Sequence, residues 1–382
     1  MKIVVAPDSF KGSLSAVDAA AAIARGARAV FPEAEVVELP IADGGEGTVA
    51  ALVRATEGRI ETTTVRGPLG APVEARWGIL GDGRTAVIEM AAASGLPLVP
   101  PARRDPRLAT TRGTGELLRA ALDAGLRRIV MGIGGSATND GGAGMARALG
   151  ARFLDGAGAE LADGGAALAR LGRIDLAGLD PRLERTEIVV ACDVSNPLTG
   201  ARGASEVYGP QKGATPEMVA ELDAALEHYA RAAREATGRD VAEAQGAGAA
   251  GGLGAGLLFF THARLRPGIE VVLEAIDFQG KLEGASLVVT GEGKTDFQTA
   301  FGKAPAGVAA AAKRRGLPVI CLSGCLGEGA EEVRARGVDA LAVVPPRPMP
   351  LEECVEQAAP LLEQAAERVF RLVRVGEHLA GH

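Results

Sequence analysis

The stretch IVVAPDSFKGS (residues 3–13) decides the fold, because an apolar run passes directly into a loop of small and polar residues. Ile3 to Ala6 is suited to a strand buried in a parallel sheet. A capping-box pattern over residues 15–18 predicts a helix that runs to about Val30. A second strand over residues 36–39 then completes a β-α-β unit.

The C-terminal part of the chain repeats this alternation of apolar runs and helical patterns. Such alternation predicts a parallel sheet with right-handed crossovers. We expect strands over 287–290, 318–322 and 340–344, a loop over 291–299, and helices over about 303–315 and 351–373.

The middle of the chain has a different pattern. Residues 73–80 and 85–90 are separated by Gly-Asp-Gly (81–83), which predicts a hairpin. We interpret residues 1–67 and 285–382 as one discontinuous doubly wound domain, and residues 68–284 as a mixed-sheet α/β domain inserted into it. The alternative is two consecutive domains.

Composition limits the function. The 382 residues carry 41 basic and 48 acidic side chains in mixed order, a net charge of -7, so no basic face for nucleic acid is visible. No apolar run is long enough to cross a membrane, and no signal peptide is apparent, which predicts a cytoplasmic protein. The four cysteines lack the spacing of a zinc site. The 53 glycines cluster with Asp, Asn, Ser and Thr.

Two of these clusters follow the first two predicted strands, at the strand ends where parallel sheets bind ligands. In the first, Lys11 suits a carboxylate or a phosphate as a point charge. In the second, Asp43 and Glu46 flank Gly44 and Gly45. These carboxylates are able to hold Mg²⁺ or accept a hydroxyl proton, although Asp43 also suits a helix cap.

A third cluster, GIGGSATNDGG (132–142), follows an apolar strand and precedes a helix. Its backbone amides suggest an anion nest at a helix N-terminus. Gly132, Gly134 and Ala137 also fit a dinucleotide fingerprint, with Asp155 at a plausible distance. Gly141 and Gly142 argue against this, because they would break the helix that the fingerprint needs.

Three further segments are of interest. The loop 291–299 imitates a P-loop but has Val288 where that motif needs glycine. No strand precedes the run 246–256, which is either a tight Gly-rich turn or a segment that gives a nucleotide access to the backbone. Asp193 lies at another strand end.

Together the clusters resemble the bacterial glycerate kinase family of the two-domain, glycerate 2-kinase-like type. The similar segments occur in order over nearly the whole chain: APDSFKGSLSA (6–16), PIADGGEGT (40–48), GIGGSATNDGGAGMARALG (132–150), ACDVSNPL (191–198), YGPQKGA (208–214), GAAGGLGAG (248–256) and GEGKTDFQTAFGKAP (291–305). Lys294 and Phe297 depart from the Arg and Ser usual in the last segment.

The resemblance implies a flavodoxin-like domain with an inserted α/β domain, and an active site in the cleft between them. It implies ATP- and Mg²⁺-dependent phosphorylation of D-glycerate, giving 2-phosphoglycerate or else 3-phosphoglycerate, by a monomer or homodimer without nucleic-acid or membrane partners. The alternatives are an NAD-dependent dehydrogenase of a small hydroxy acid and a non-catalytic glycerate-binding sensor.

On this basis we assign roles to the clustered residues. Asp193 is the first choice of general base and Asp43 the second, with Lys11 as a further catalytic residue. Mg²⁺ is assigned to Asp296 and Glu292. Substrate binding is assigned to Asp8, Ser9, Lys11, Ser13, Gly44, Gly45 and Asn196, and phosphate or nucleotide binding to Gly134, Gly135, Ser136, Thr138, Asn139, Asp140, Gly251, Gly252, Gly291 and Glu292.

Overall fold

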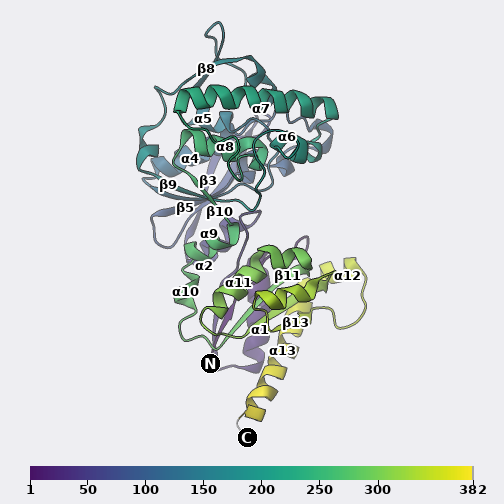
Figure 1. Ribbon diagram of the computed structural model, residues 1–382. Helices are drawn as coiled ribbons and strands as arrows, with labels where there is room; N and C mark the ends of the chain where they lie inside the picture. The colour runs from purple at the N-terminus through teal and green to yellow at the C-terminus, as the bar shows by residue number, and fades with distance from the viewer. Residues whose placement is uncertain (381–382) are drawn as a thin grey trace. The chain divides into compact units, whose positions relative to one another are not determined.

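The computed structural model describes residues 1–380, and backbone proximity divides the chain into two compact units (Figure 1). Unit 1 contains Met1–Asp43, Ala50–Glu57 and the chain from Ile269 onward, whereas unit 2 contains Gly44–Val49 and Gly58–Gly268. Each unit has a sheet of its own. No helix within residues 1–380 has the length and apolarity needed to span a membrane.

Unit 1 is built on a five-stranded parallel sheet with the order β13-β12-β11-β1-β2. This is the strand order of flavodoxin-like doubly wound folds. β1 lies between β11 and β2, which explains why Ile3, Val4 and Val5 are fully buried. The strands are β1 (Lys2–Val5), β2 (Glu35–Glu38), β11 (Leu287–Thr295), β12 (Val319–Leu326) and β13 (Ala340–Val343).

Helices pack on this sheet, and the first and last of them lie side by side (Figure 1). Gly26 permits this approach, because a Cβ there would lie 2.6 Å from the carbonyl oxygen of Glu363. The helices are α1 (Ala16–Val30), α2 (Thr48–Ala55), α9 (Gly268–Ala275), α10 (Phe278–Lys281), α11 (Ala304–Lys313), α12 (Leu351–Glu356) and α13 (Ala358–Ala380), with 3-10 turns at Phe297–Phe301 and Ala330–Arg336.

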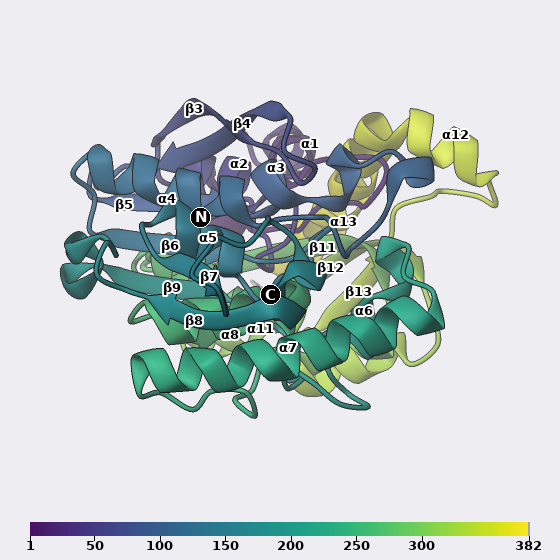
Figure 2. The ribbon, with the colours of Figure 1, turned by 90° about the horizontal axis from the view of Figure 1, so that it is seen from above.

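Unit 2 contains a mixed sheet with the order β10-β9-β6-β5-β4-β3. Figure 2 shows its parallel strands β5, β6 and β9 next to one another. β4 and β5 form the expected antiparallel hairpin. The strands are β3 (Arg59–Arg66), β4 (Pro72–Ile79), β5 (Thr85–Glu89), β6 (Arg128–Gly132), β9 (Glu187–Ala191) and β10 (Arg264–Arg266), and β7 (Arg152–Asp155) pairs only with β8 (Leu171–Asp175).

The unit 2 helices enclose two apolar cores, one on the sheet and one beneath the long helix α7. They are α3 (Ala91–Ser94), α4 (Arg112–Asp123), α5 (Ala143–Ala148), α6 (Ala204–Tyr208), α7 (Pro216–Thr237) and α8 (Ala249–Phe260), with 3-10 turns at Leu96–Leu98, Pro101–Arg103, Gly165–Arg170, Pro181–Arg185 and Pro210–Lys212.

The expected α/β class is confirmed, with a parallel sheet from both ends of the chain and a mixed sheet from its middle. The unit boundaries differ from the expected ranges at three segments, the first of which, residues 44–49, lies in unit 2. Residues 58–67 lie in unit 2 because β3 pairs along its whole length with β4. Residues 269–284 lie in unit 1, where Ile269 packs on Gly307 and the Gln279 side chain donates to the Ala311 carbonyl at 3.2 Å.

Two expected elements were wrong in detail. The loop expected over 291–299 is strand as far as Thr295, because β12 continues to pair with β11 up to Thr295 and Leu326. The single helix expected over 351–373 is two helices, α12 and α13, separated at Gln357.

Candidate active site

Three carboxylates gather at the carboxyl ends of adjacent strands in unit 1. Asp8 follows β1 and Asp43 follows β2, while Glu292 belongs to β11 on the other side of β1. The Asp8 amide donates to the Gly291 carbonyl at 2.8 Å, which ties the loop to β11. Burial, together with the charges of Asp43 and Glu292, raises the pKa of Asp8 to about 7. A carboxyl group with such a pKa is suited to exchange a proton near neutral pH.

The loop after Asp8 is held in a tight turn. The Ser9 amide donates to Asp8 Oδ1 at 2.6 Å, and the Ser13 hydroxyl donates to the Phe10 carbonyl at 2.8 Å. Lys11 at the tip is exposed. Gly293 of β11 lies close to the turn, since a Cβ there would be 3.2 Å from the backbone nitrogen of Lys11. The turn thus presents Lys11 beside the end of β11.

Glu292 and Asp296, the pair assigned to Mg²⁺, have other partners. Glu292 Oε1 accepts from the hydroxyls of Thr299 at 2.6 Å and Thr295 at 3.1 Å. Asp296 accepts from the Gln298 amide at 3.0 Å and pairs with Lys294 at 3.1 Å, and this lysine lowers the pKa of Asp296. Across residues 1–380, no three His, Cys, Asp or Glu side chains are grouped to hold a metal ion.

In unit 2, the residues Gly44 and Gly45 pack onto the carboxyl ends of β6 and β9. A Cβ at Gly44 would lie 2.5 Å from the Cβ of Ala191, and one at Gly132 would lie 2.3 Å from the Gly44 carbonyl oxygen. Only glycine fits at these contacts, and Gly44 also has a φ of 94°. The predicted substrate glycines therefore lie against the start of the 132–142 loop.

The 132–142 loop has an exposed and a buried part. Gly134 and Gly135 are exposed, whereas the rest of the loop from Ser136 is buried. The helix that follows the loop, α5, begins at Ala143, and an anion nest at its N-terminus stays a prediction. The first amides near that helix, those of Gly142 and Gly144, already donate to the Asp140 carboxylate at 3.1 and 3.2 Å.

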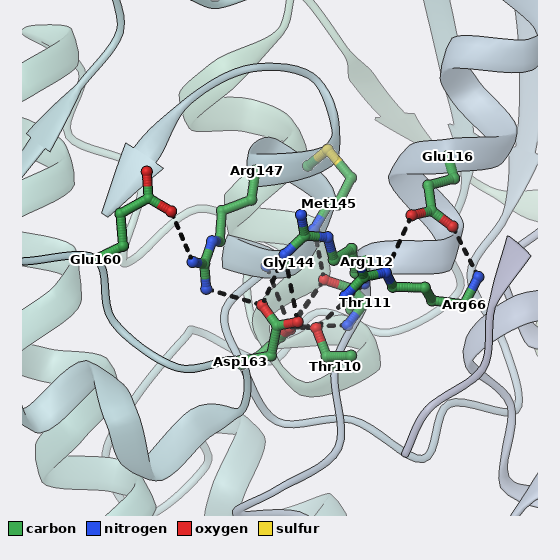
Figure 3. A network of polar contacts seen from close by, with 11 residues as sticks. Arg66, Thr110, Thr111, Arg112, Glu116, Gly144, Met145, Arg147, Glu160 and Asp163 are labelled. Atoms are coloured by element: carbon green, nitrogen blue, oxygen red, sulfur yellow. Dashed lines mark hydrogen bonds and ion pairs between the residues drawn. The ribbon is translucent and has the colours of Figure 1, made fainter. Parts of the chain in front are cut away.

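Asp140 is buried, and burial raises the pKa of its carboxyl group while its hydrogen bonds lower it. Its carboxylate also accepts from the Thr111 amide at 2.8 Å and from the Thr111 hydroxyl at 3.0 and 3.1 Å. Thr111, Gly144 and Met145 appear at the centre of Figure 3, where the adjacent Arg112 and Arg147 both reach Asp163. These contacts join the starts of α4 and α5.

Sequence reasoning gave no role to Lys212, which is only 2% exposed. Its Nζ donates to the Thr138 carbonyl at 2.6 Å. Burial lowers the pKa of Lys212 to about 7, against the opposing effect of Asp140. The only signal in the sequence was its place in the YGPQKGA segment, since burial of a lysine cannot be inferred from a local pattern.

Asn139, Gly251 and Gly252 are also buried. The Asn139 side chain donates to the Ser205 hydroxyl at 2.9 Å. Gly251 and Gly252 lie in a left-handed kink of α8, with φ of 68° and 86°, and pack on the backbone of residues 138–141. These three residues hold the loop from within, and their expected contact with nucleotide stays a prediction.

Asp193 and Asn196 follow β9 and bind protein groups. Asp193 Oδ1 accepts from the Gly268 amide at 2.7 Å, at the start of α9. Asn196 accepts from the Tyr208 hydroxyl at 2.6 Å and donates to the Arg202 carbonyl at 2.8 Å. The sequence also missed Glu89 at the end of β5, whose Oε1 accepts from the Val49 amide at 2.7 Å.

The geometry of Asp155 contradicts the dinucleotide fingerprint. In a dinucleotide-binding unit the acidic residue follows the next strand of the same parallel sheet. Asp155 instead ends β7, which pairs only with antiparallel β8 outside the main sheet. The loop 132–142 is therefore not followed by the β-α-β arrangement that a dehydrogenase of that type needs.

Comparisons with known proteins agree with the geometry. The glycerate kinase family model matches residues 3–374. Glycerate kinase of Bacillus subtilis is 54% identical over 99% of both chains. Glycerate 2-kinase of Escherichia coli is 50% identical over the full length of both chains. A crystal structure assigned to glycerate kinase 2 of Salmonella typhimurium LT2 superimposes with a TM-score of 0.91 at 52% identity, over 99% of each chain.

The family model and the named relatives show an α/β phosphotransferase, and its loop at 291–299 has Val288 where a P-loop needs glycine. Within that class, the chain belongs to the glycerate kinase family.

Proposed function

We propose that this enzyme transfers the γ-phosphoryl group of ATP to the 2-hydroxyl of D-glycerate. Membership of the glycerate kinase family supports the reaction. The relative from Escherichia coli named glycerate 2-kinase, similar along the full chain, supports 2-phosphoglycerate as the product. The observation that carries the chemistry is Asp8, a carboxyl with a pKa of about 7 beside two other acids.

Asp8 is our proposed general base. Phosphoryl transfer to an alcohol needs a group that takes the hydroxyl proton while the oxygen attacks in line. Asp8 follows β1, an interior strand of the unit 1 sheet, and its Oδ1 is fixed by the Ser9 amide. Asp43 next to it supports the site through its charge. Asp193, our first choice from the sequence, has a carboxylate oxygen that already binds the Gly268 amide.

Lys11 is proposed to bind the glycerate carboxylate. Its exposed position at the tip of the 8–13 turn lies on the same edge of the unit 1 sheet as Asp8. An ammonium group there neutralises the substrate charge without needing a fixed fork geometry. Ser9 and Ser13 keep the turn in shape, which makes Lys11 the main contact with the substrate in this loop.

The start of the 132–142 loop, with the exposed Gly134 and Gly135 and the buried Ser136, is proposed to bind phosphate through backbone amides. Gly135 has a φ of 75°, and its carbonyl is fixed by the Leu96 amide at 2.8 Å. Because the carboxylates of Glu292 and Asp296 are engaged elsewhere, they do not fit as a pair of Mg²⁺ ligands. Bound together with ATP, Mg²⁺ would supply neutralisation of phosphate charge. A site formed between two domains stays a prediction.

A coupled assay tests the proposal. ADP formation that requires both D-glycerate and MgATP, with 2-phosphoglycerate identified by ³¹P NMR, is the expected result. Formation of 3-phosphoglycerate would show that the 3-hydroxyl, and not the 2-hydroxyl, attacks ATP. Glycerate binding without turnover would favour a sensor, and a change in NADH absorbance would favour a dehydrogenase; either result would overturn the kinase proposal.

A further inference from the structure

Two carboxylates of unit 2 bind the backbone at places where the chain leaves that unit. The division between the units falls after Val49 and after Gly268. The amide of Val49 donates to Glu89 Oε1 at 2.7 Å, and the amide of Gly268 donates to Asp193 Oδ1, also at 2.7 Å. At both places where the chain passes from unit 2 into unit 1, the backbone amide of the last unit 2 residue is therefore bound by a carboxylate.

The two acids share the same structural origin. Glu89 ends β5 and Asp193 follows β9, the strands on either side of β6. Each bonded amide lies in the first turn of a helix, α2 or α9, where N–H groups have no partner within the helix. A carboxylate at such a position gains a charge-assisted hydrogen bond and a favourable interaction with the helix dipole.

Glu89 also fixes the loop that carries Gly44 and Gly45. Besides Val49, the Gly47 amide donates to the Glu89 carboxylate, and burial raises the pKa of this group while both hydrogen bonds lower it. The loop is thus fixed at its end by Glu89, and at its start by the packing of Gly44 on Ala191.

We propose that Glu89 and Asp193 are positioning residues that fix the two exits of the chain from unit 2. They act through the starts of α2 and α9, and Glu89 in addition holds the 44–48 loop in the shape that binds substrate. This inference rests on the proposed function, which assigns that loop to glycerate. It also gives Asp193 a role other than proton abstraction.

Hydrogen–deuterium exchange on the full chain tests the anchors directly. In Glu89→Ala, amides 47–50 are expected to exchange about tenfold faster or more, the loss expected for one charged hydrogen bond. In Asp193→Ala, the same increase is expected at amides 268–270 alone. Glu187→Gln, an exposed acid at the other end of β9, is the matched control and leaves both segments unchanged.

Steady-state kinetics distinguish a positioning residue from a general base. Glu89→Gln keeps the size of the side chain and carries the test if the alanine variant does not fold; it is expected to raise KM for glycerate more than it lowers kcat. Asp193→Asn is expected to retain kcat within about tenfold, whereas loss of a general base costs about 100-fold or more. Unchanged exchange, or a collapse of kcat in Asp193→Asn, would overturn the proposal. Absence of ADP formation by the unaltered enzyme would instead reject the proposed function, and the exchange result would stand.

Discussion

The ammonium group of Lys212 donates to the carbonyl oxygen of Thr138 at 2.6 Å, and both side chains are buried. This bond joins the 3-10 turn after α6 to the loop that follows β6. Asp140, two residues further along the loop, contributes the nearby negative charge. A lysine removed from water in this way is tolerated only where a carbonyl and a carboxylate compensate for its lost hydration.

Replacing Lys212 by methionine is expected to destabilise unit 2. The substitution leaves the Thr138 carbonyl and the Asp140 carboxylate without their positive partner, which costs about 3 kcal/mol in free energy of unfolding. Urea unfolding followed by circular dichroism measures the change. Lys281→Met, on an exposed position of α10, is the control and should cost little. Equal midpoints for the two variants would show that the buried contact is not stabilising.

The stability gained from Lys212 should depend on pH in a defined direction. Its pKa is lowered from 10.5 to about 7 in the folded state, so the folded protein binds fewer protons than the unfolded chain between these values. The free energy of unfolding therefore rises with pH across about 7 to 10.5. Unfolding of the unaltered protein and of Lys212→Met at pH 7, 8, 9 and 10 should show a growing difference. A constant difference would contradict the lowered pKa.

Asp8→Asn is expected to lose activity and gain stability. Without the base, kcat should fall by about 100-fold to 10,000-fold. The raised pKa of Asp8 means that the folded state binds more protons between about 4 and 7, so its contribution becomes unfavourable as pH rises through this window. The free energy of unfolding of the variant should thus be higher than that of the unaltered protein at pH 8 and equal to it at pH 4. Asp18→Asn, at an exposed position of α1 where the carboxylate accepts from the nearby Ser15 hydroxyl, is the control for loss of a carboxylate.

The pH dependence of kcat/KM tests the neighbours of Asp8. Activity should rise with pH to a plateau, with a midpoint near the Asp8 pKa of about 7. Removing the charge of Asp43 or Glu292 should lower this midpoint by about half a unit to one unit, because a nearby like charge raises a carboxyl pKa. The profiles of Asp43→Asn and Glu292→Gln, each measured over pH 5 to 9, provide the comparison. If the midpoint is the same in both variants as in the unaltered enzyme, the charges of Asp43 and Glu292 do not raise the pKa of Asp8.

The sequence predicted the elements whose patterns are local. β1, α1 and β2 follow from an apolar run and a capping box, and the β4–β5 hairpin follows from its Gly-Asp-Gly turn. The extension of β11 through Gly293 to Thr295 was missed because glycine and lysine are poor strand formers. It is the pairing with β12 that makes these residues a strand.

The site was predicted at the level of loops and less well at the level of side chains. Strand-end position identified Asp8 and Asp43 as functional candidates, but their mutual charge effects depend on the strand order. Asp193 looked like a free carboxylate at a strand end, and its partner Gly268 is remote in sequence. The burial of Lys212 and Asp140 was not predicted either, since burial of a charged group depends on packing between distant segments.

The place of β1 in its sheet has a consequence for protein synthesis. Its first apolar residue, Ile3, pairs with Leu287, so its neighbour β11 leaves the ribosome only after the whole of unit 2 has been made. Domains generally fold as units during translation, so unit 2 is able to fold while β1 still lacks its partner strand β11. During that interval, the edge of β1 that later pairs with β11 has unpaired backbone N–H and C=O groups. Such an unpaired strand edge is a typical binding target for chaperones. The order of assembly is therefore the reverse of the order in which the two units begin.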